Sequence, residues 1–555
     1  MEDTLRRIGL ISDVADSGNT GELIVLALKQ AGTSHLFTLN GAHIWPLLTG
    51  CVEHGIRIVD TRHEQTAAFA AEGWSKVTRE CGVAAVTAGP GVTNAVSAIT
   101  AAHSNDSPLL VVGGRAPEAR WGMGSLQEID HVPILATVTK RAMAVKSAAD
   151  AYGATVSALS EALSPRTGPV FFDVPFDTFL AGEDFPAERA APAPDPGPAP
   201  DPEQVQKAAA LLRNAKQPAV IAGSGVWWAH AEAELRAFAE AADLPLYTNG
   251  LARGMLPPDH RLFRSRSRST GLGDSDLVFV VGVPLDFRLN WGQPPSLRDD
   301  AGVVYVDIDD FRKHREPAAN LYGDIRKALA ALAEAARDVP RHEQWLEQLA
   351  TKEAESRERD RPLYESDSTP IHPARVVAEV GAFLDPDAVV VGDGGDYVSF
   401  AGRYLERPAP GLFIDPGPYG CLGSGPGYAL AAKLAHPDRQ VVLLSGDGAF
   451  GFSGLEFDTL IRHQVPVVCV IGNNGIWATE KHPMQNVLGT SIAADLRPGT
   501  RYDKVVDALG GYGELVEQPG EIRPALERAF KAGVPACLNV ICDPTAEYPR
   551  SSVLM

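Results

Sequence analysis

The sequence predicts an α/β protein built from three doubly wound parallel-sheet domains. Apolar strand-like runs alternate with segments of helical periodicity along most of the chain. A proline- and alanine-rich stretch at residues 185–202 and a charged stretch at residues 342–365 interrupt this alternation. The length of 555 residues is enough for about three domains of ordinary size. We therefore expect domains at residues 14–185, 200–340 and 368–550.

The composition indicates an ordinary soluble protein, with 45% hydrophobic and 22% charged residues. A net charge of −20 argues against binding to nucleic acid or to anionic membrane surfaces, but it permits a basic pocket for an anionic small molecule. The six cysteines lack metal-like spacing. The first residues lack a signal-peptide core, and no run of about 18 apolar residues is present. We expect a cytoplasmic protein.

The first domain is predicted from strand–helix units between residues 19 and 114. His43 follows one predicted strand and Glu64 follows the next, so both are expected at the sheet edge where α/β proteins bind ligands. His43 is a candidate to orient a substrate oxygen or to shuttle a proton, although a surface histidine at a helix N-terminus fits almost as well. Glu64 taken alone is typical of a helix N-terminus, where the dipole favours a carboxylate.

The stretch at residues 185–202, FPAERAAPAPDPGPAPDP, is predicted to be an extended linker. The central domain beyond it contains the turn GSGVWW, which is an incomplete dinucleotide motif and therefore a weak signal. Asp307 and Asp309 end a predicted strand. They either bind an adenosine ribose or merely end the strand, and the second interpretation is favoured.

The most specific pattern of the third domain lies at residues 441–482. A buried strand ends at Gly446-Asp447-Gly448, a helix follows, and a second buried strand ends at two asparagines. In a right-handed βαβ unit both turns lie at the same sheet edge, so Asp447 and Asn474 are expected side by side. A carboxylate and an amide oxygen suit Mg²⁺, which completes its octahedron with water and phosphate. GDG alone would fit an ordinary loop.

The spacing of 27 positions from Asp447 to Asn474 resembles the signature of the thiamine diphosphate (ThDP) enzymes. The segments RHEQTAAFAAEG at residues 62–73 and TAGPGVTNAV at residues 87–96 are similar to that family as well. The resemblance implies a pyrimidine-binding first domain, a Rossmann-like central domain and a diphosphate-binding third domain. It implies ThDP and Mg²⁺ as cofactors. The implied metal ligands are Asp447, Asn474 and the carbonyl of Ile476. The residues implied to surround the diphosphate are Gly448, Ala449 and Asn474.

The same resemblance assigns roles to other residues. It implies that Glu64 protonates N1′ of the aminopyrimidine from an apolar cleft that raises its pKa. Gly420 lies in the loop that grips the aminopyrimidine, and Leu422 is the apolar wedge that bends the cofactor. The turn at Asp396 and Tyr397 is a candidate to donate amides to the diphosphate. Gln127, in an FQE-like segment, either reaches into the active site or lies in a surface loop.

The central-domain segment from RSRS to LDFRLNWGQPP resembles the 2-hydroxyacyl-CoA lyases and oxalyl-CoA decarboxylases. Arginines at 264, 266 and 268 form a basic stripe, which suits the phosphates of CoA, although a solvated loop explains it as well. The resemblance implies CoA contacts from Arg268, Ser269, Arg403 and Arg550. Glu480 follows the metal turn and is the candidate base for the substrate hydroxyl, although an ordinary surface glutamate fits equally well.

We expect reversible cleavage of a short 2-hydroxyacyl-CoA to formyl-CoA and an aldehyde or ketone. An acetolactate synthase-like or benzaldehyde lyase-like carboligase without CoA is the alternative. The segments FTLNGAHI and DTRHE resemble both the branch of acetolactate synthase-like enzymes and 2-hydroxyacyl-CoA lyase 2, and benzaldehyde lyase. A non-catalytic relative should lack Glu64 or the metal turn, and both are present. The family further implies a homodimeric active unit and a homotetramer. ADP is a possible ligand of the central domain, and FAD is not expected.

Overall fold

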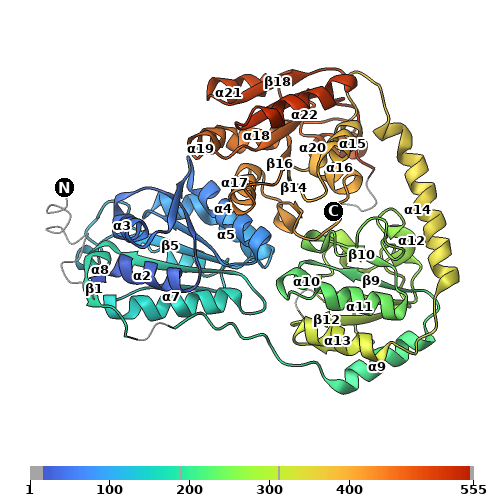
Figure 1. The fold of residues 1–555 in the computed structure, drawn as a ribbon, viewed down its shortest axis with the longest axis horizontal. Helices are drawn as coiled ribbons and strands as arrows, with labels where there is room; N and C mark the ends of the chain where they lie inside the picture. Colours follow the sequence, from blue (N-terminus) through green and yellow to red (C-terminus); the bar gives the residue numbers. More distant parts are fainter. Residues whose placement is uncertain (1–16, 188–189, 311–312, 550–555) are drawn as a thin grey trace.

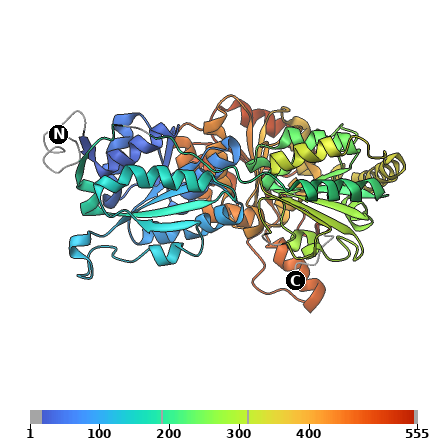
Figure 2. The ribbon, with the colours of Figure 1, turned by 90° about the horizontal axis from the view of Figure 1, so that it is seen from below.

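The computed structural model describes residues 17–187, 190–310 and 313–549. Three parallel sheets are flanked by helices on both faces, which confirms the predicted fold class (Figure 1). Figure 2 shows the first domain and the central domain at opposite ends, with the third domain between them. Residues 14–16 of the predicted first domain lie outside the described residues. Arg550, a predicted CoA contact, lies outside them as well. Within these ranges, no helix is long and apolar enough to cross a membrane.

The first domain is built on a six-stranded sheet in the order β3-β2-β4-β5-β7-β6, with every pair parallel. Strands β4, β5 and β7 are buried throughout, because helices cover both faces. A small antiparallel pair, β1 and β8, closes the domain. The elements are β1 (Ser17–Asn19), α2 (Thr20–Gln30), β2 (His35–Leu39), η1 (Ala42–Ile44), α3 (Trp45–His54), β3 (Arg57–Asp60), α4 (Glu64–Thr78), β4 (Gly82–Val86), α5 (Pro90–Ser104), β5 (Leu109–Arg115), η2 (Glu118–Arg120), α6 (Val132–Leu135), β6 (Arg141–Ala144), α7 (Ala148–Leu163), β7 (Pro169–Pro175), α8 (Phe176–Leu180) and β8 (Gly182–Asp184).

The proline-rich linker forms no helix or strand in its described part, as predicted. It runs along α7, where the amide of Ala193 donates to the Ser160 hydroxyl at 3.1 Å. The amide of Asp195 donates to the Ser164 hydroxyl at 3.1 Å. An extended chain with many prolines does not form the hydrogen bonds of a β-sheet. The two serine hydroxyls therefore satisfy linker amides that would otherwise lack a partner in the chain.

The central domain contains a five-stranded parallel sheet in the order β10-β9-β11-β12-β13. The GSG segment at residues 223–225 does not form an extended glycine-rich turn. It forms the start of the short helix α10. A Cβ on Gly223 would lie 2.6 Å from the carbonyl oxygen of Gly282, so close backbone packing accounts for this glycine. The elements are α9 (Pro202–Asn214), β9 (Pro218–Ala222), α10 (Ser224–Trp228), α11 (Glu232–Ala242), β10 (Leu246–Thr248), η3 (Gly250–Ala252), α12 (Arg268–Gly273), β11 (Leu277–Val281), η4 (Phe287–Gly292), β12 (Gly302–Asp307), β13 (Ala319–Tyr322) and α13 (Ile325–Ala335).

The charged connector forms one long helix, α14 (Glu343–Tyr364), which runs from the central to the third domain (Figure 1). The third domain has a six-stranded parallel sheet in the order β15-β14-β16-β17-β19-β18. Its elements are α15 (Pro373–Phe383), β14 (Val389–Asp393), α16 (Asp396–Tyr404), β15 (Phe413–Ile414), η5 (Gly417–Tyr419), α17 (Gly425–Ala435), β16 (Val441–Gly446), α18 (Asp447–Ser453), η6 (Gly454–Glu456), α19 (Phe457–Arg462), β17 (Val468–Asn473), α20 (Ala478–Leu488), α21 (Tyr502–Ala508), β18 (Tyr512–Val516), η7 (Pro519–Glu521), α22 (Ile522–Lys531) and β19 (Ala536–Ile541).

Helices α4 and α17 hold the first and third domains together. Gly73 permits their close approach, because a Cβ there would lie 2.8 Å from Cα of Tyr428. The Tyr428 hydroxyl donates to Glu72 at 2.6 Å, and Glu72 also pairs with Lys76 at 3.0 Å. Lys76 then donates to the carbonyl of Asp415 at 2.9 Å. Removing one partner of such a fully buried pair costs about 3–5 kcal/mol, so this network fixes the domain arrangement.

Candidate active site

The two predicted metal turns lie side by side. Asp447 follows β16 and Asn474 follows β17, and these strands pair in parallel with Gly446 opposite Gly472. The amide of Gly475 donates to Oδ2 of Asp447 at 2.9 Å, which ties the turns together. The crossover that connects neighbouring parallel strands therefore brings both polar turns to one sheet edge.

Asp447 is suited to hold a divalent cation. It is 3% exposed, and no cation pairs with it among the residues the structure describes. Burial raises the pKa of Asp447 to about 6. A buried carboxylate without a counter-charge is costly, and a metal ion would compensate it. The oxygens of Asp447, Asn474 and the Ile476 carbonyl fit the hard Mg²⁺ ion, which takes its remaining ligands from phosphate and water.

A large cavity, about 1110 Å³ in volume, lies between the third and central domains. It brings together the predicted cofactor residues, the predicted CoA residues and Glu480, which is exposed in the first turn of α20. The predicted residues along its wall are Arg268, Ser269, Asp396, Tyr397, Arg403, Gly420, Leu422, Asp447, Gly448, Ala449, Asn474, Ile476 and Glu480. Three predicted catalytic residues of the first domain, Glu64, His43 and Gln127, are not part of this wall.

The wedge loop that carries Gly420 and Leu422 is anchored by Asp393, which the sequence analysis did not single out. Asp393 is fully buried at the end of β14 and accepts the amides of Gly423 at 3.1 Å and Gly425 at 2.9 Å. Burial raises the pKa of Asp393 to about 6. Leu422 is half-buried in the cavity wall, in keeping with a side chain that contributes volume. The GDGG pattern, which ends a predicted strand, was the available signal for Asp393.

The predicted turn at Asp396 and Tyr397 forms the first turn of α16. The Tyr397 side chain is only 6% exposed, and a Cβ on Gly472 would lie 2.5 Å from its ring. Burial raises the pKa of Tyr397 well above its usual value. Its hydroxyl has no hydrogen-bond partner within the described part of the chain. Tyr397 therefore packs beside the metal turns.

Within the basic stripe, Arg266 is neutralised by a carboxylate of α14, and the same carboxylate engages Arg403. Arg266 and Arg403 both pair with Asp360, at 3.2 and 2.6 Å. Glu353 accepts the amides of Arg266 and Ser267 at 2.9 Å each. Because these carboxylates come from a segment far along the chain, the sequence pattern showed the cations without their partners. Arg403, predicted to contact CoA, is engaged in an ion pair.

Arg264 donates to the carbonyls of Arg261 and Phe263 at 2.9 and 2.6 Å. Arg268 likewise has no carboxylate partner among the described residues. It donates to Oδ1 of Asn249 at 2.7 Å. Burial and the nearby Arg253 and Arg288 lower the pKa of Arg268 to about 10. Asn249 is 9% exposed and lines the cavity, and its Nδ2 lacks a partner within the described ranges. Arg268 thus lines the cavity without a carboxylate partner, and the buried, unused amide donor of Asn249 lies beside it. Sequence reasoning missed Asn249, which appeared only as part of a strand-ending NG turn.

The first-domain edge holds Glu64, His43 and Gln127. Glu64 is the first residue of α4, is 8% exposed, and accepts a hydrogen bond from Nδ2 of Asn94 at 3.0 Å. His43 is 7% exposed, and its Nδ1 lies 3.1 Å from Oγ1 of Thr87. Burial lowers the pKa of His43, so the ring is biased toward the neutral form. Gln127 has a positive φ of 60° in a loop beside this edge.

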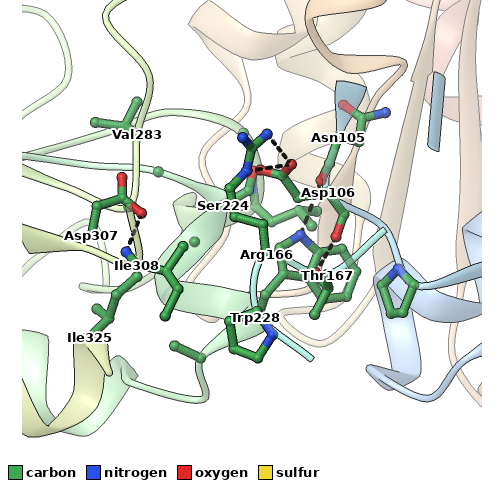
Figure 3. Close-up of a pocket in the computed structure, with 18 of the residues that line it drawn as sticks. Asn105, Asp106, Arg166, Thr167, Ser224, Trp228, Val283, Asp307, Ile308 and Ile325 are labelled. Carbon is green, nitrogen blue, oxygen red and sulfur yellow. Dashed lines mark hydrogen bonds and ion pairs between the residues drawn. The ribbon is translucent and has the colours of Figure 1, made fainter. Parts of the chain in front are cut away.

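A second cavity, about 300 Å³ in volume, lies between the first and central domains (Figure 3). Arg166 pairs with Asp106 at 2.8 Å on one side. Asp307 ends β12 on the other side, where it accepts the amide of Ile308 at 2.9 Å and pairs with Lys313 at 2.7 Å. Trp228 contributes an aromatic wall.

Three models of one protein family match the chain, each over one domain. Residues 18–134 match the N-terminal TPP binding domain of thiamine pyrophosphate enzymes, where TPP is another name for ThDP. Residues 205–332 match the central domain of these enzymes. Residues 393–540 match their C-terminal TPP binding domain. Each match falls inside one of the domain ranges predicted from the sequence.

Individual relatives resemble the chain over almost its whole length. It is 53% identical to the acetolactate synthase large subunit of Mycobacterium tuberculosis, over 97% of this chain and 98% of that protein. It is 34% identical to the 2-hydroxyacyl-CoA lyase 2 of Bos taurus, over 98% of this chain and 93% of that protein. Identity to the 2-hydroxyacyl-CoA lyase of Oryza sativa is 30%, over 94% of each chain.

Proposed function

The chain belongs to the thiamine pyrophosphate enzymes, and from this membership we propose that it is an acetolactate synthase-like carboligase that does not use CoA. The observation that carries the proposal is 53% identity over 97% of the chain to an acetolactate synthase. The expected cleavage of a 2-hydroxyacyl-CoA is less well supported, at 34% identity. In the proposed reaction, two molecules of pyruvate give one acetolactate and one CO₂.

The segment that resembles a CoA site is less basic than its arginines suggest, because several of them are engaged within the chain. A CoA moiety would need several cations for its phosphates. Arg266 and Arg403 are committed to Asp360, while Arg264 donates to the carbonyls of Arg261 and Phe263. Arg268, which has no carboxylate partner among the described residues, would bind one small anion, such as the carboxylate of a 2-oxo acid.

The proposal assigns the cofactor to the edge of the third sheet. Asp447, Asn474 and the carbonyl of Ile476 would hold Mg²⁺, and Gly448 and Ala449 would let the backbone approach the diphosphate. A Cβ on Gly448 would lie 2.4 Å from the Trp477 ring, so only glycine fits there. When bound, thiamine diphosphate supplies a nucleophilic carbon and an electron sink for cleavage or formation of a C–C bond.

The other candidate catalytic residues are assigned roles in proton transfer and hydrogen bonding. Glu64 would exchange a proton with the aminopyrimidine, held in orientation by Asn94. His43 and Gln127 would orient substrate oxygens from the first domain, and His43 is suited to this because its neutral ring both donates and accepts. Glu480 would exchange a proton with the product hydroxyl from the rim of the cavity.

Arg268→Ala should raise KM for pyruvate by about 10–100-fold, because a charge-assisted hydrogen bond is worth about 1.5–3 kcal/mol. Binding of ThDP should stay unchanged, since Arg268 belongs to the central domain. Steady-state kinetics with pyruvate and a titration with ThDP measure the two quantities.

Arg359→Ala is the matched control for that experiment. Arg359 lines the same cavity, but its side chain is 70% exposed and its contact with Asp360 is long, at 3.9 Å. Its loss should leave KM for pyruvate within about twofold of wild type, as expected for an exposed ion pair. Equal effects of the two substitutions on KM would argue against a carboxylate site at Arg268.

The active unit is proposed to be a homodimer within a homotetramer, with Glu64 of one subunit meeting Asp447 of another. Glu64 lies outside the cavity lined by Asp447 in a single chain. Large apolar side chains beside both halves are exposed, including Phe452 at 62% and Leu126 at 77%. Exposed apolar groups next to incomplete sites support burial by a second copy of the chain.

The smaller cavity is proposed to take ADP rather than FAD, and the location is proposed to be cytoplasmic. Arg166, Trp228 and the end of β12 supply a cation, an aromatic face and a carboxylate for an adenine nucleotide. A carboligation has no net redox change, so it gives a flavin no chemical task. The six cysteines are free thiols, which suits a reducing compartment.

Incubation with pyruvate, ThDP and Mg²⁺ tests the proposed function. Acetolactate and CO₂ should form in equal amounts. Release of formyl-CoA from a 2-hydroxyacyl-CoA, without acetolactate from pyruvate, would favour the lyase instead.

A further inference from the structure

The first domain contains a buried histidine–aspartate pair that the sequence analysis did not identify. Asp173 lies in β7 and His131 directly precedes α6, and both side chains are 0% exposed. Nδ1 of His131 lies 3.0 Å from each carboxylate oxygen of Asp173. Arg115 pairs with the same carboxylate at 3.2 Å. The buried charge of Asp173 is therefore compensated by a cation and a hydrogen bond.

The second ring nitrogen of His131 holds a backbone turn. The amide of Gly89 donates to Nε2 of His131 at 2.9 Å. A backbone amide only donates, so Nε2 carries no proton, and the ring proton resides on Nδ1, facing Asp173. Gly89 has φ +60° and ψ −114°, a conformation that side chains strongly disfavour. His131 thus fixes a turn that glycine alone forms readily.

This turn supports two candidate catalytic residues. Gly89 is the N-cap of α5, and Asn94 in the second turn of that helix donates to Glu64 at 3.0 Å. Gln127 packs directly on Gly89, since a Cβ on Gly89 would lie 2.8 Å from Cβ of Gln127. A shift of the turn would therefore move the hydrogen bond to Glu64 and displace Gln127 together.

We propose that His131 is a positioning residue for the reaction: oriented by Asp173, it holds Gly89 and thereby sets the placement of Asn94 against Glu64. The inference rests on the proposed function, because it takes Glu64 to act on the cofactor. His131 touches neither cofactor nor substrate in this account. Its effect reaches the reaction through α5 and the loop that carries Gln127.

The test compares His131→Leu with His131→Gln. Leucine has a similar volume but no acceptor, whereas glutamine accepts from Gly89 and donates to Asp173. In the apoprotein, hydrogen–deuterium exchange of the segment 87–94 should accelerate about tenfold in the leucine variant and stay near wild type in the glutamine variant. In the loaded enzyme, kcat should fall at least about tenfold for leucine, with KM and ThDP affinity within about twofold. If His131→Leu does not fold, His131→Asn, which is too short to reach Gly89, replaces it.

His342→Leu is the control, since His342 is 6% exposed at the N-cap of the connecting helix α14 and lines neither cavity. It should leave exchange at residues 87–94 and kcat unchanged. Wild-type exchange and kcat in His131→Leu would overturn the proposal, and so would equal losses in His131→Gln. If the wild type binds ThDP but forms no acetolactate, the proposed function fails. Exchange in the apoprotein then still decides whether His131 holds the turn.

Discussion

Glu64→Gln should lower kcat by about 10²–10⁴-fold, the usual contribution of a positioned acid–base group. Glutamine keeps the shape of the side chain and the hydrogen bond from Asn94, which is 3.0 Å in the wild type. Only the exchangeable proton of the carboxyl group is lost. Affinity for Mg²⁺ and ThDP should remain, because the metal and diphosphate contacts belong to the third domain. Stopped-assay kinetics and a ThDP titration measure the two effects.

Glu22→Gln is the control for the loss of a glutamate carboxyl. Glu22 is 2% exposed in the first domain, lies in the capping box of α2, and lines neither cavity. Its replacement should leave kcat near wild type. A Glu64→Gln enzyme with wild-type kcat would show that another group carries the proton.

Asp447→Ala should weaken retention of ThDP by at least about 100-fold, since even outer partners of metal ligands contribute about 10–100-fold in affinity. Asp447 is the buried carboxylate of the proposed metal set, and it also accepts the amide of Gly475 at 2.9 Å. Removing it takes away the one negatively charged side chain that is proposed to bind Mg²⁺ directly. Quenching of intrinsic fluorescence during a ThDP titration, at several Mg²⁺ concentrations, measures the effect.

Asp438→Ala serves as the comparison for this substitution, because Asp438 is exposed in the loop before β16. ThDP affinity in that variant should match wild type. Wild-type retention of ThDP in Asp447→Ala would place the metal elsewhere.

The fold and the juxtaposition of the two polar turns were predictable because their signals are local. The run VVLLSG is apolar and β-branched and ends at glycine, and it forms β16 (Val441–Gly446). The second run forms β17 (Val468–Asn473). Chain chirality then requires the crossover that places Asp447 beside Asn474.

The charge balance of the large cavity was not predictable from the sequence. Asp360, which neutralises Arg266, lies 94 positions away, and it is also 43 positions from Arg403. A charged helix gives no indication of which carboxylates face inward. The arginine-rich stripe consequently resembled a CoA site. In the structure, Arg266 pairs with a carboxylate and Arg264 donates to main-chain carbonyls, whereas Arg268 donates to the side chain of Asn249.

The positioning pair was hidden for the same reason. His131 and Asp173 are 42 positions apart, and each resembles a common loop or strand-end residue when taken alone. Their importance arises only when both ring nitrogens of His131 are seen to be engaged. Contacts between a loop residue and a strand residue far apart in the chain are decided by tertiary packing, which local sequence patterns do not encode.

The central claim is that one ThDP site combines Glu64 of one subunit with Asp447 of another. Mixing the two inactive variants, Glu64→Gln and Asp447→Ala, under conditions that exchange subunits tests it most directly. Random reassortment of equal amounts should restore about a quarter of the wild-type sites, because that fraction pairs an intact Glu64 with an intact Asp447. Recovery of acetolactate synthesis near that level is the predicted result. No recovery after demonstrated subunit exchange would show that both residues act within a single chain, and would contradict the account.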